Sequence, residues 1–340
     1  MKFSKSLAIT SIANDDNEVL QLFAEQCNKR NIYFVVAGDS KSPENFELTN
    51  CDYFSLQRQR NLSFRLASSL PEKKYSRKNI GYLVAMSKGT EVIVETDDDN
   101  FPLETFWEDR NSNVQAYVLQ NKGWVNIYKY FTDENIWPRG FDLKKIQQPL
   151  TEKGELQSNI ICPIQQGLAN LNPDVDAIFR LTSKLPLQFN ESGNFALGEN
   201  TWCPFNSQNT TWFKDAFPLL YLPTFCSFRM TDIWRSFVAQ RIAWTNGWHV
   251  LFHNATVYQL RNEHDFLKDF QDEVLGYLYN GEICNELQNL HLKSGNEFIF
   301  DNMIKCYEAF IDHELITPEE LKLLNDWIED CNNVLHHCMN

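Results

Sequence analysis

Three consecutive aspartates, Asp97, Asp98 and Asp99, end a strand-like run whose apolar part is residues 92–94. The run predicts a buried strand, and carboxylates at its carboxyl end would lie where open α/β sheets bind ligands. Adjacent carboxylates repel one another unless a cation offsets their charge. Hard divalent ions such as Mg²⁺ and Mn²⁺ prefer oxygen ligands, often one or two carboxylates together with substrate phosphates. The aspartates therefore predict a metal–diphosphate site for a nucleotide-sugar, and the alternative is a solvated acidic turn.

The segments around the aspartates predict a parallel sheet. Apolar runs alternate with helical patterns, and a strand–helix–strand order is typical of a parallel sheet. Gly89 is the expected C-cap of the helix before the aspartates, and residues 41–75 are polar and irregular. We expect strands at 6–12, 32–37 and 91–95, and helices at 18–29 and 79–88.

The later part of the chain predicts a mixed α/β domain followed by helices. A helix is expected at 231–244 with Thr231 as its N-cap, and the segment 131–165 is expected to be a long loop region. Acidic helical patterns begin at about residue 263. Further strands are expected at 116–120, 125–127, 219–222 and 248–252, and C-terminal helices at 266–279, 298–313 and 318–335. We therefore divide the chain into a catalytic domain at 1–262 and a helical C-terminal region at 263–340.

Composition and charge limit the classes of function. The 340 residues carry a formal net charge of −14, which disfavours nucleic acid as a partner. The exception is a basic stretch at 58–78, which contains seven lysines and arginines and one acidic residue, Glu72. The 9 cysteines show no paired spacing, so no zinc or disulfide framework is indicated. No apolar run approaches the roughly 18–20 residues of a membrane span, and we expect a cytoplasmic protein without a transmembrane segment.

The helix before the aspartates begins with residues that suit a phosphate. Arg77, Lys78 and Asn79 open it, and Gly81 lies in its first turn. A basic pair at this position could reach a phosphate or a base near the sheet edge, and glycine permits close approach to the backbone. The alternative is a glycine needed for packing and a solvated lysine.

The order of R-x-N-x-G-Y, a short helix, an apolar strand and D-D-D resembles the donor half of the GT-A glycosyltransferases. That likeness implies a GT-A-like, Rossmann-like mixed sheet flanked by helices. It also implies that the aspartates hold a divalent ion, Mn²⁺ or Mg²⁺, which bridges the diphosphate. By the same resemblance, Asp99 would be the main metal contact. Asp97 would lie towards the ribose or a metal-bound water, and Asp98 beside the nucleotide.

Three later stretches resemble the STELLO family, proteins with a glycosyltransferase-like domain. They are W-P-R-G at 137–140, P-F-N-S-Q-N-T at 204–210 and T-D-I-W-R at 231–235, and the likeness covers roughly residues 75–260. The chain departs from the plant members in its expected lack of a transmembrane anchor, so a Golgi location is not carried over. Its full D-D-D favours metal-dependent catalysis.

Asp232 is the candidate catalytic residue. It lies at the expected start of a helix, where the helix macrodipole stabilises a carboxylate. Inverting GT-A enzymes, which the chain resembles, use an acidic residue in a similar place as general base. Such a base takes a proton from the acceptor hydroxyl. The alternative is that Asp232 only caps its helix.

Further candidates would contact the donor, the acceptor or the metal. A guanidinium suits phosphate oxygens, amides suit sugar hydroxyls, and an indole can stack on a sugar ring. The resemblance implies a third metal ligand near His253. The candidates are Arg139 and Arg235 for phosphate or acceptor, Asn206, Gln208 and Asn209 for sugar, and Trp137 for stacking. For the amides, the alternative is a loop held by side-chain–backbone hydrogen bonds.

Together these features predict a metal-dependent glycosyltransferase that moves a sugar from a UDP-sugar to a glycan or lipid-linked acceptor with inversion. A role in polysaccharide biosynthesis follows from that class. Two alternatives stay open: a UDP-sugar mutase of the reversibly glycosylated polypeptide type, and a non-catalytic scaffold for a polysaccharide synthase. The helical C-terminus could support a homo-oligomer.

Overall fold

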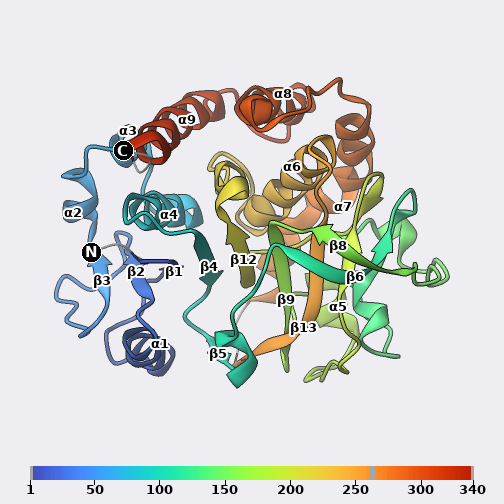
Figure 1. The fold of residues 1–340 in the computed structure, drawn as a ribbon, viewed down its shortest axis with the longest axis horizontal. Coiled ribbons are helices and arrows are strands. Elements are labelled where there is room, and N and C mark those ends of the chain that lie inside the picture. Colours follow the sequence, from blue (N-terminus) through green and yellow to red (C-terminus); the bar gives the residue numbers. More distant parts are fainter. Residues whose placement is uncertain (1–2, 261–264, 338–340) are drawn as a thin grey trace.

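The computed structural model describes residues 3–260 and 265–337, so the expected domain boundary between 262 and 263 lies outside the described residues. One large mixed sheet runs through the molecule (Figure 1). Its first part is parallel and has the order β3-β2-β1-β4. These strands are β1 (Lys5–Thr10), β2 (Tyr33–Ala37), β3 (Asp52–Phe54) and β4 (Val92–Thr96).

Two helices cover opposite faces of the parallel strands, with α4 (Lys78–Ser87) above and α1 (Glu18–Lys29) below in Figure 1. Asn17 caps α1 by accepting a hydrogen bond from the Leu20 amide at 2.9 Å. Gly89 follows α4 with a φ of 71°, a left-handed conformation that glycine adopts without strain. These helices and strands confirm the expected βαβ order near the N-terminus.

The second part of the sheet mixes strand directions. β12 (Asn209–Phe213) pairs antiparallel with β4 and with β9 (Ile164–Asn170). Helix α6 (Thr231–Thr245) covers this half on the same side as α4 (Figure 1). Beyond β9 the order is β13 (Val250–Gln259), β10 (Phe195–Leu197), β6 (Asn113–Leu119) and β8 (Leu156–Ile161), and β5 (Asn100–Pro102) pairs with β13. A separate ribbon joins β7 (Gly123–Trp124) to β11 (Thr201–Trp202).

Several sequence-based expectations were wrong in detail. The segment 41–75 holds β3 and two short helices, α2 (Leu56–Arg60) and α3 (Arg65–Ser69). The segment 131–165 contains β8 and the start of β9. No strand forms at 125–127 or 219–222. A 3₁₀ turn begins at Ile127, and another 3₁₀ segment that contains Pro218 extends to Leu220. Thr231 lies inside α6, and the cap position is Met230.

The C-terminal helices are α7 (Phe266–Asn289), α8 (Ile299–Asp312) and α9 (Glu320–His337). α9 packs on α3 and α4, and α8 packs on α6 and α7, which Figure 1 shows as an outer layer above the sheet. The largest apolar cluster joins side chains of both regions, including Tyr82, Trp234 and Trp327. Helix α5 (Ala177–Thr182) contacts α7. Within the described ranges, no helix is long and apolar enough to span a bilayer.

Candidate active site

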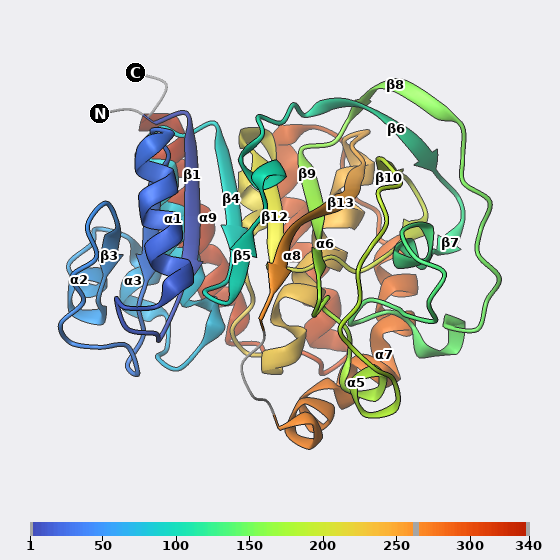
Figure 2. The same ribbon diagram turned by 90° about the horizontal axis from the view of Figure 1, so that it is seen from below.

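The carboxyl ends of β1 and β4 form the candidate active site. The chain leaves β1 through α1 to β2 on one side, whereas β4 pairs with β1 on the other side. Figure 2 shows β4 beside β1. Ligands of doubly wound sheets bind where the strand order reverses in this way. At this point Ser11 Oγ donates a hydrogen bond to the Asp98 carboxylate, and Asn17 Nδ2 donates to the Asp98 carbonyl oxygen at 3.2 Å.

A buried ammonium holds the first aspartate. Lys78 is 0% exposed, and its Nζ donates to Asp97 Oδ1 at 3.0 Å and to the carbonyl oxygens of Thr96 and Ser207 at 2.7 and 3.2 Å. Tyr75 OH donates to the same Oδ1 at 2.7 Å. The Asp97 side chain is 28% exposed, and among the described residues its Oδ2 has no hydrogen-bond donor. Asp97 therefore keeps one oxygen for a ligand.

The other two aspartates have different surroundings. Burial raises the pKa of Asp98, and the hydrogen bond from Ser11 opposes that shift. A nearby cation would favour its ionised form. Asp99 Oδ2 accepts a hydrogen bond from Gln259 Nε2 at 2.9 Å, and Gln259 lies opposite Asn100 where β13 pairs with β5. The structure thus brings strand β13 to the aspartates through Gln259.

His253 does not join the aspartates. It lies earlier along β13, opposite Gly167 of β9, and its Nδ1 is 2.9 Å from the Asn254 carbonyl oxygen. Burial lowers its pKa to about 3, so the imidazole is neutral at physiological pH. The strand register, which the sequence does not reveal, separates this histidine from the aspartate turn.

The residues at the turn suit a hard divalent ion. Within the described parts of the chain, no three His, Cys, Asp or Glu side chains gather into a complete metal cluster. Mg²⁺ and Mn²⁺ sites often need only one or two carboxylates, with phosphate oxygens and waters completing the shell. Asp97 and Asp98 each accept described hydrogen bonds on a single oxygen. They therefore fit such an ion.

Ser207 connects the aspartate turn to Asp232. Its Oγ lies 2.6 Å from Tyr75 OH, and its amide and Oγ lie 3.1 and 3.2 Å from Asp232 Oδ2. Because Lys78 also donates to the Ser207 carbonyl oxygen, one hydrogen-bonded chain joins Asp97 to Asp232. Neither Tyr75 nor Ser207 was among the predicted site residues, although Ser207 lies within the amide-rich stretch.

Asp232 is buried in an ion pair with Arg139. The guanidinium donates to Asp232 Oδ1 and Oδ2 at 3.0 and 2.9 Å and forms a second bidentate pair with Asp174 at 2.8 and 2.7 Å. Burial alone would raise the pKa of Asp232, but the Arg139 guanidinium outweighs it and holds that pKa below its usual range. Arg139 is thereby engaged with two carboxylates, and Asp232 is ionised.

Arg235 pairs with a carboxylate inside the core. It donates to Glu95 at 2.9 and 2.8 Å, and Glu95 also accepts a hydrogen bond from Trp212 Nε1 at 2.8 Å. Arg235 and Glu95 are 1% and 0% exposed. In this arrangement, Arg235 fixes α6 to β4 behind the aspartates. Its guanidinium does not extend into the turn itself.

The predicted sugar-binding amides are largely bonded within the protein. Asn206 Oδ1 accepts from the Gln208 amide at 3.0 Å, and Asn209 Nδ2 donates to the Leu168 carbonyl oxygen and Thr256 Oγ1 at 3.0 and 2.8 Å. These contacts match the alternative of a loop held by side-chain hydrogen bonds. The segment they hold contains Ser207, so they position the link between the aspartates and Asp232.

Three other candidates also have internal partners. Asn79 Nδ2 donates to the Leu222 carbonyl oxygen and its Oδ1 accepts from the Leu222 amide, both at 2.9 Å. Trp137 Nε1 donates to Asp176 at 2.6 Å. Arg77 donates to the Leu70 carbonyl oxygen at 2.9 Å, away from its neighbour Lys78.

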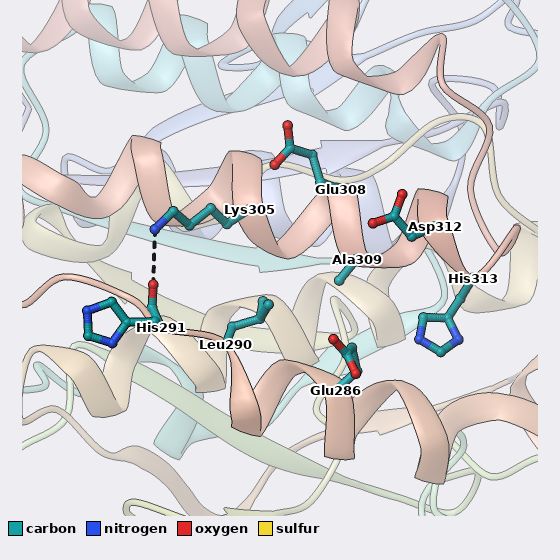
Figure 3. Close-up of a pocket in the computed structure, with 8 residues that line it drawn as sticks. All are labelled: Glu286, Leu290, His291, Lys305, Glu308, Ala309, Asp312 and His313. Carbon is teal, nitrogen blue, oxygen red and sulfur yellow. Dashed lines mark hydrogen bonds between the residues drawn. The ribbon is translucent and has the colours of Figure 1, made fainter.

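A separate groove lies between α7 and α8 (Figure 3). It encloses about 360 Å³ and is lined by the carboxylates of Glu286, Glu308 and Asp312 beside His291 and His313. Lys305 Nζ crosses it to the His291 carbonyl oxygen at 3.0 Å. None of the predicted site residues lines this groove, so it is not the candidate active site.

The fold and the site define the class of protein. Acidic residues at the switch point of a parallel sheet, antiparallel strands beyond it, and flanking helices form a GT-A-like glycosyltransferase fold. The comparisons with known proteins agree with this class. The family model of the STELLO glycosyltransferases matches residues 229–338, which supports the resemblance of this chain to the STELLO-type family.

Two curated proteins of Arabidopsis thaliana are similar to most of the chain. "Probable glycosyltransferase STELLO2" is 28% identical over 330 residues, which cover 87% of this chain and 41% of that protein. "Probable glycosyltransferase STELLO1" is 28% identical over 321 residues, covering 87% and 40%. The chain therefore spans about two fifths of the length of these relatives. The family match includes the C-terminal helices, which the sequence-based resemblance left out.

Proposed function

We propose that the chain is a metal-dependent glycosyltransferase that binds a nucleotide-diphosphate sugar, UDP-linked, at the carboxyl ends of β1 and β4. The observation that carries this proposal is the hydrogen-bonded chain from Asp97 through Lys78 and Ser207 to Asp232. It joins a donor-type acidic turn to a candidate base on α6. A glycan or lipid-linked acceptor would supply the hydroxyl.

Asp97 and Asp98 would hold Mn²⁺ or Mg²⁺, with Asp99 held beside them by Gln259. The ion would offset the charge that develops on the leaving diphosphate. Lys78 keeps Asp97 in place and adds a positive charge at the same turn. Ser11 keeps Asp98 in place through a hydrogen bond from its hydroxyl.

Asp232 would act as the general base that gives inversion. Its lowered pKa keeps the carboxylate ionised, as a general base must be, but the ion pair with Arg139 also makes it a weaker base than a free aspartate. The role also requires that Asp232 Oδ2 exchange the two hydrogen bonds from Ser207 for one from the acceptor hydroxyl. Arg139 would then hold the carboxylate from the other side.

The first test is a thermal-shift panel of nucleotides and nucleotide-sugars, each with Mn²⁺ and with EDTA. A ligand at 100 times its dissociation constant adds about 2.7 kcal/mol of stability, so binding is visible. We expect a shift with uridine nucleotides that needs Mn²⁺, is lost in Asp97→Asn, and persists in Asp109→Asn, a matched change at a fully exposed aspartate. No shift with any nucleotide would contradict the proposal.

The saturated Asp232 carboxylate gives specific support to a second candidate, a glycosyltransferase-like scaffold. A carboxylate that accepts from Arg139 and twice from Ser207 can be purely structural. Transfer of a labelled sugar separates the two functions. Turnover that survives Asp232→Asn would remove the base role, and donor binding without any turnover or hydrolysis would favour the scaffold.

A further inference from the structure

Four of the seven cations in the basic stretch at 58–78 form ion pairs, and Lys73, Lys74 and Arg77 form none among the described residues. Most of its charged side chains have identifiable partners: Arg58 pairs with Asp52, Arg60 with Glu72, Arg65 with Glu329, and Lys78 with Asp97. Arg77 has no such pair within the described residues. Of these unpaired cations only Arg77 is buried, with 2% of its surface exposed.

The Arg77 guanidinium uses little of its hydrogen-bonding capacity. In the described parts of the chain, its side chain donates only to the Leu70 carbonyl oxygen, and its Nε is buried without a partner. Burial lowers the pKa of Arg77, and the carboxylates of Asp39 and Glu72 oppose that shift from a distance. An arginine still keeps its charge in a protein, and a buried charge without a counter-ion is costly.

Arg77 lines a hollow of about 560 Å³ at the end of α3. Arg60 of α2 lines the same hollow, and its charge is near enough to Arg77 to lower the pKa of Arg77. The hollow is distinct from the aspartate turn because Lys78 points to Asp97 whereas Arg77 points to Leu70. Its lining residues are Arg60, Ala67, Ser68, Ser69, Leu70, Pro71, Glu72 and Arg77.

We propose that this hollow is a second binding site, separate from the donor site, for a phosphate group. A guanidinium forks onto phosphate or carboxylate oxygens. A carboxylate has two oxygens and matches one fork, whereas a phosphate can accept from Arg77 and Arg60 together. Glu72 now pairs with Arg60, and a bound phosphate competes with Glu72 for that guanidinium.

The test is calorimetric titration of the full chain with inorganic phosphate in EDTA, where a metal-dependent donor site takes no part. We expect saturable binding that weakens on the order of tenfold or more in Arg77→Gln, since a charge-assisted pair is lost. Glu72→Gln should strengthen binding by removing the competing carboxylate. Arg65→Gln is the matched control, because Arg65 is as exposed as Arg60 and is also paired with a glutamate.

Three results would overturn the proposal. The first is the absence of saturable phosphate binding to the unaltered chain, and the second is binding that neither Arg60→Gln nor Glu72→Gln changes. These two variants alter partly exposed side chains and keep the test valid if Arg77→Gln fails to fold. The third is loss of phosphate binding in Asp97→Asn, or joint loss of phosphate and UDP binding in Arg60→Gln, which would make the hollow part of the donor site.

Discussion

At the scale of single residues, Lys78 shows how one ammonium can hold three segments together. It reaches the 3₁₀ turn that contains Tyr75, the end of β4 and the segment of Ser207. Its neighbour Arg77 turns the opposite way. Two adjacent cations thus have different partners: Lys78 contacts the aspartate turn, and Arg77 contacts the Leu70 carbonyl oxygen.

Lys78→Met should destabilise the protein by about 3 kcal/mol, because it leaves Asp97 without its counter-ion and two carbonyl oxygens without this donor. Urea unfolding would measure the loss. Lys214→Met is the matched control, since Lys214 pairs with Glu91 at the surface and such pairs contribute about 0–1 kcal/mol. Equal losses in the two variants would show that the buried ammonium has no special role.

Arg139→Gln should give a pH-dependent loss of stability. The pKa of Asp232 lies below its usual range in the folded protein, so its ion pair stabilises the fold above the unfolded pKa of about 3.9 and stops doing so as the pH falls through the folded value. In the variant, buried Asp232 has lost its counter-ion. We expect a loss of about 3–5 kcal/mol at pH 7 that shrinks towards pH 3.

Denaturant titrations at several pH values would measure this loss. Arg65→Gln serves as the control, because its exposed pair with Glu329 should give a loss below about 1 kcal/mol at every pH. A loss in Arg139→Gln that stays constant from pH 7 to pH 3 would be inconsistent with an ionised, buried Asp232.

Residue types predicted an acidic turn after a strand, but not the buried ion pair between Lys78 and Asp97 or the internal partners of the other cations. Arg139 and Arg235 look like phosphate ligands in the sequence. Their carboxylate partners, Asp174 and Glu95, lie far from them along the chain. Ser11 was missed for the same reason, since a serine at the end of a strand becomes informative only when β4 lies beside β1.

At the scale of elements, Gly140 controls how closely the W-P-R-G segment approaches α6. Its φ is +84°, and a Cβ there would lie 2.4 Å from Cγ2 of Ile233, one residue after Asp232. Gly140→Ala should therefore combine about 1–2 kcal/mol of backbone strain with about 1–3 kcal/mol of overpacking. Thermal or urea unfolding would measure the sum.

Gly123→Ala is the control for that change. Gly123 has a similar φ of +65°, but a Cβ there would meet nothing within 4 Å, so only the backbone strain is expected. If the two alanine variants lost the same stability, the contact with Ile233 would not limit the approach of the two segments.

Helices with clear periodicity were predicted well, whereas polar central strands were not. The bounds of α1 and α6 agree closely with the predicted ranges 18–29 and 231–244. The expected loop region at 131–165 included the start of β9, where Gln165 and the next residue, Gln166, are buried and donate to carbonyl oxygens of the protein. Buried polar groups are tolerated when they are hydrogen-bonded, and only the folded structure shows those partners.

At the scale of the whole molecule, the C-terminal helices share the core of the sheet domain. Trp327 of α9 is fully buried beside Tyr221, and its Nε1 donates to the Pro218 carbonyl oxygen at 3.0 Å. Glu320 at the start of α9 accepts hydrogen bonds from the amides of Thr224 and Phe225. The two regions are therefore expected to unfold together.

Trp327→Ala should cost about 3–5 kcal/mol, as expected for a buried tryptophan, and should lower one cooperative transition. Calorimetry with a second optical probe would measure it. Lys322→Ala, on the exposed face of α9, should change stability by less than about 0.5 kcal/mol. Separate melting of the helical region in either variant would contradict a shared core.

The position of β12 has a consequence for synthesis of the chain on the ribosome. β12 completes the sheet between β4 and β9, yet it is translated after both of them. Until residue 213 has emerged, the β4 edge lacks its neighbour and offers unpaired backbone groups to other chains. The nascent protein thus passes through a long aggregation-exposed interval, and its yield depends on protection of that edge during translation.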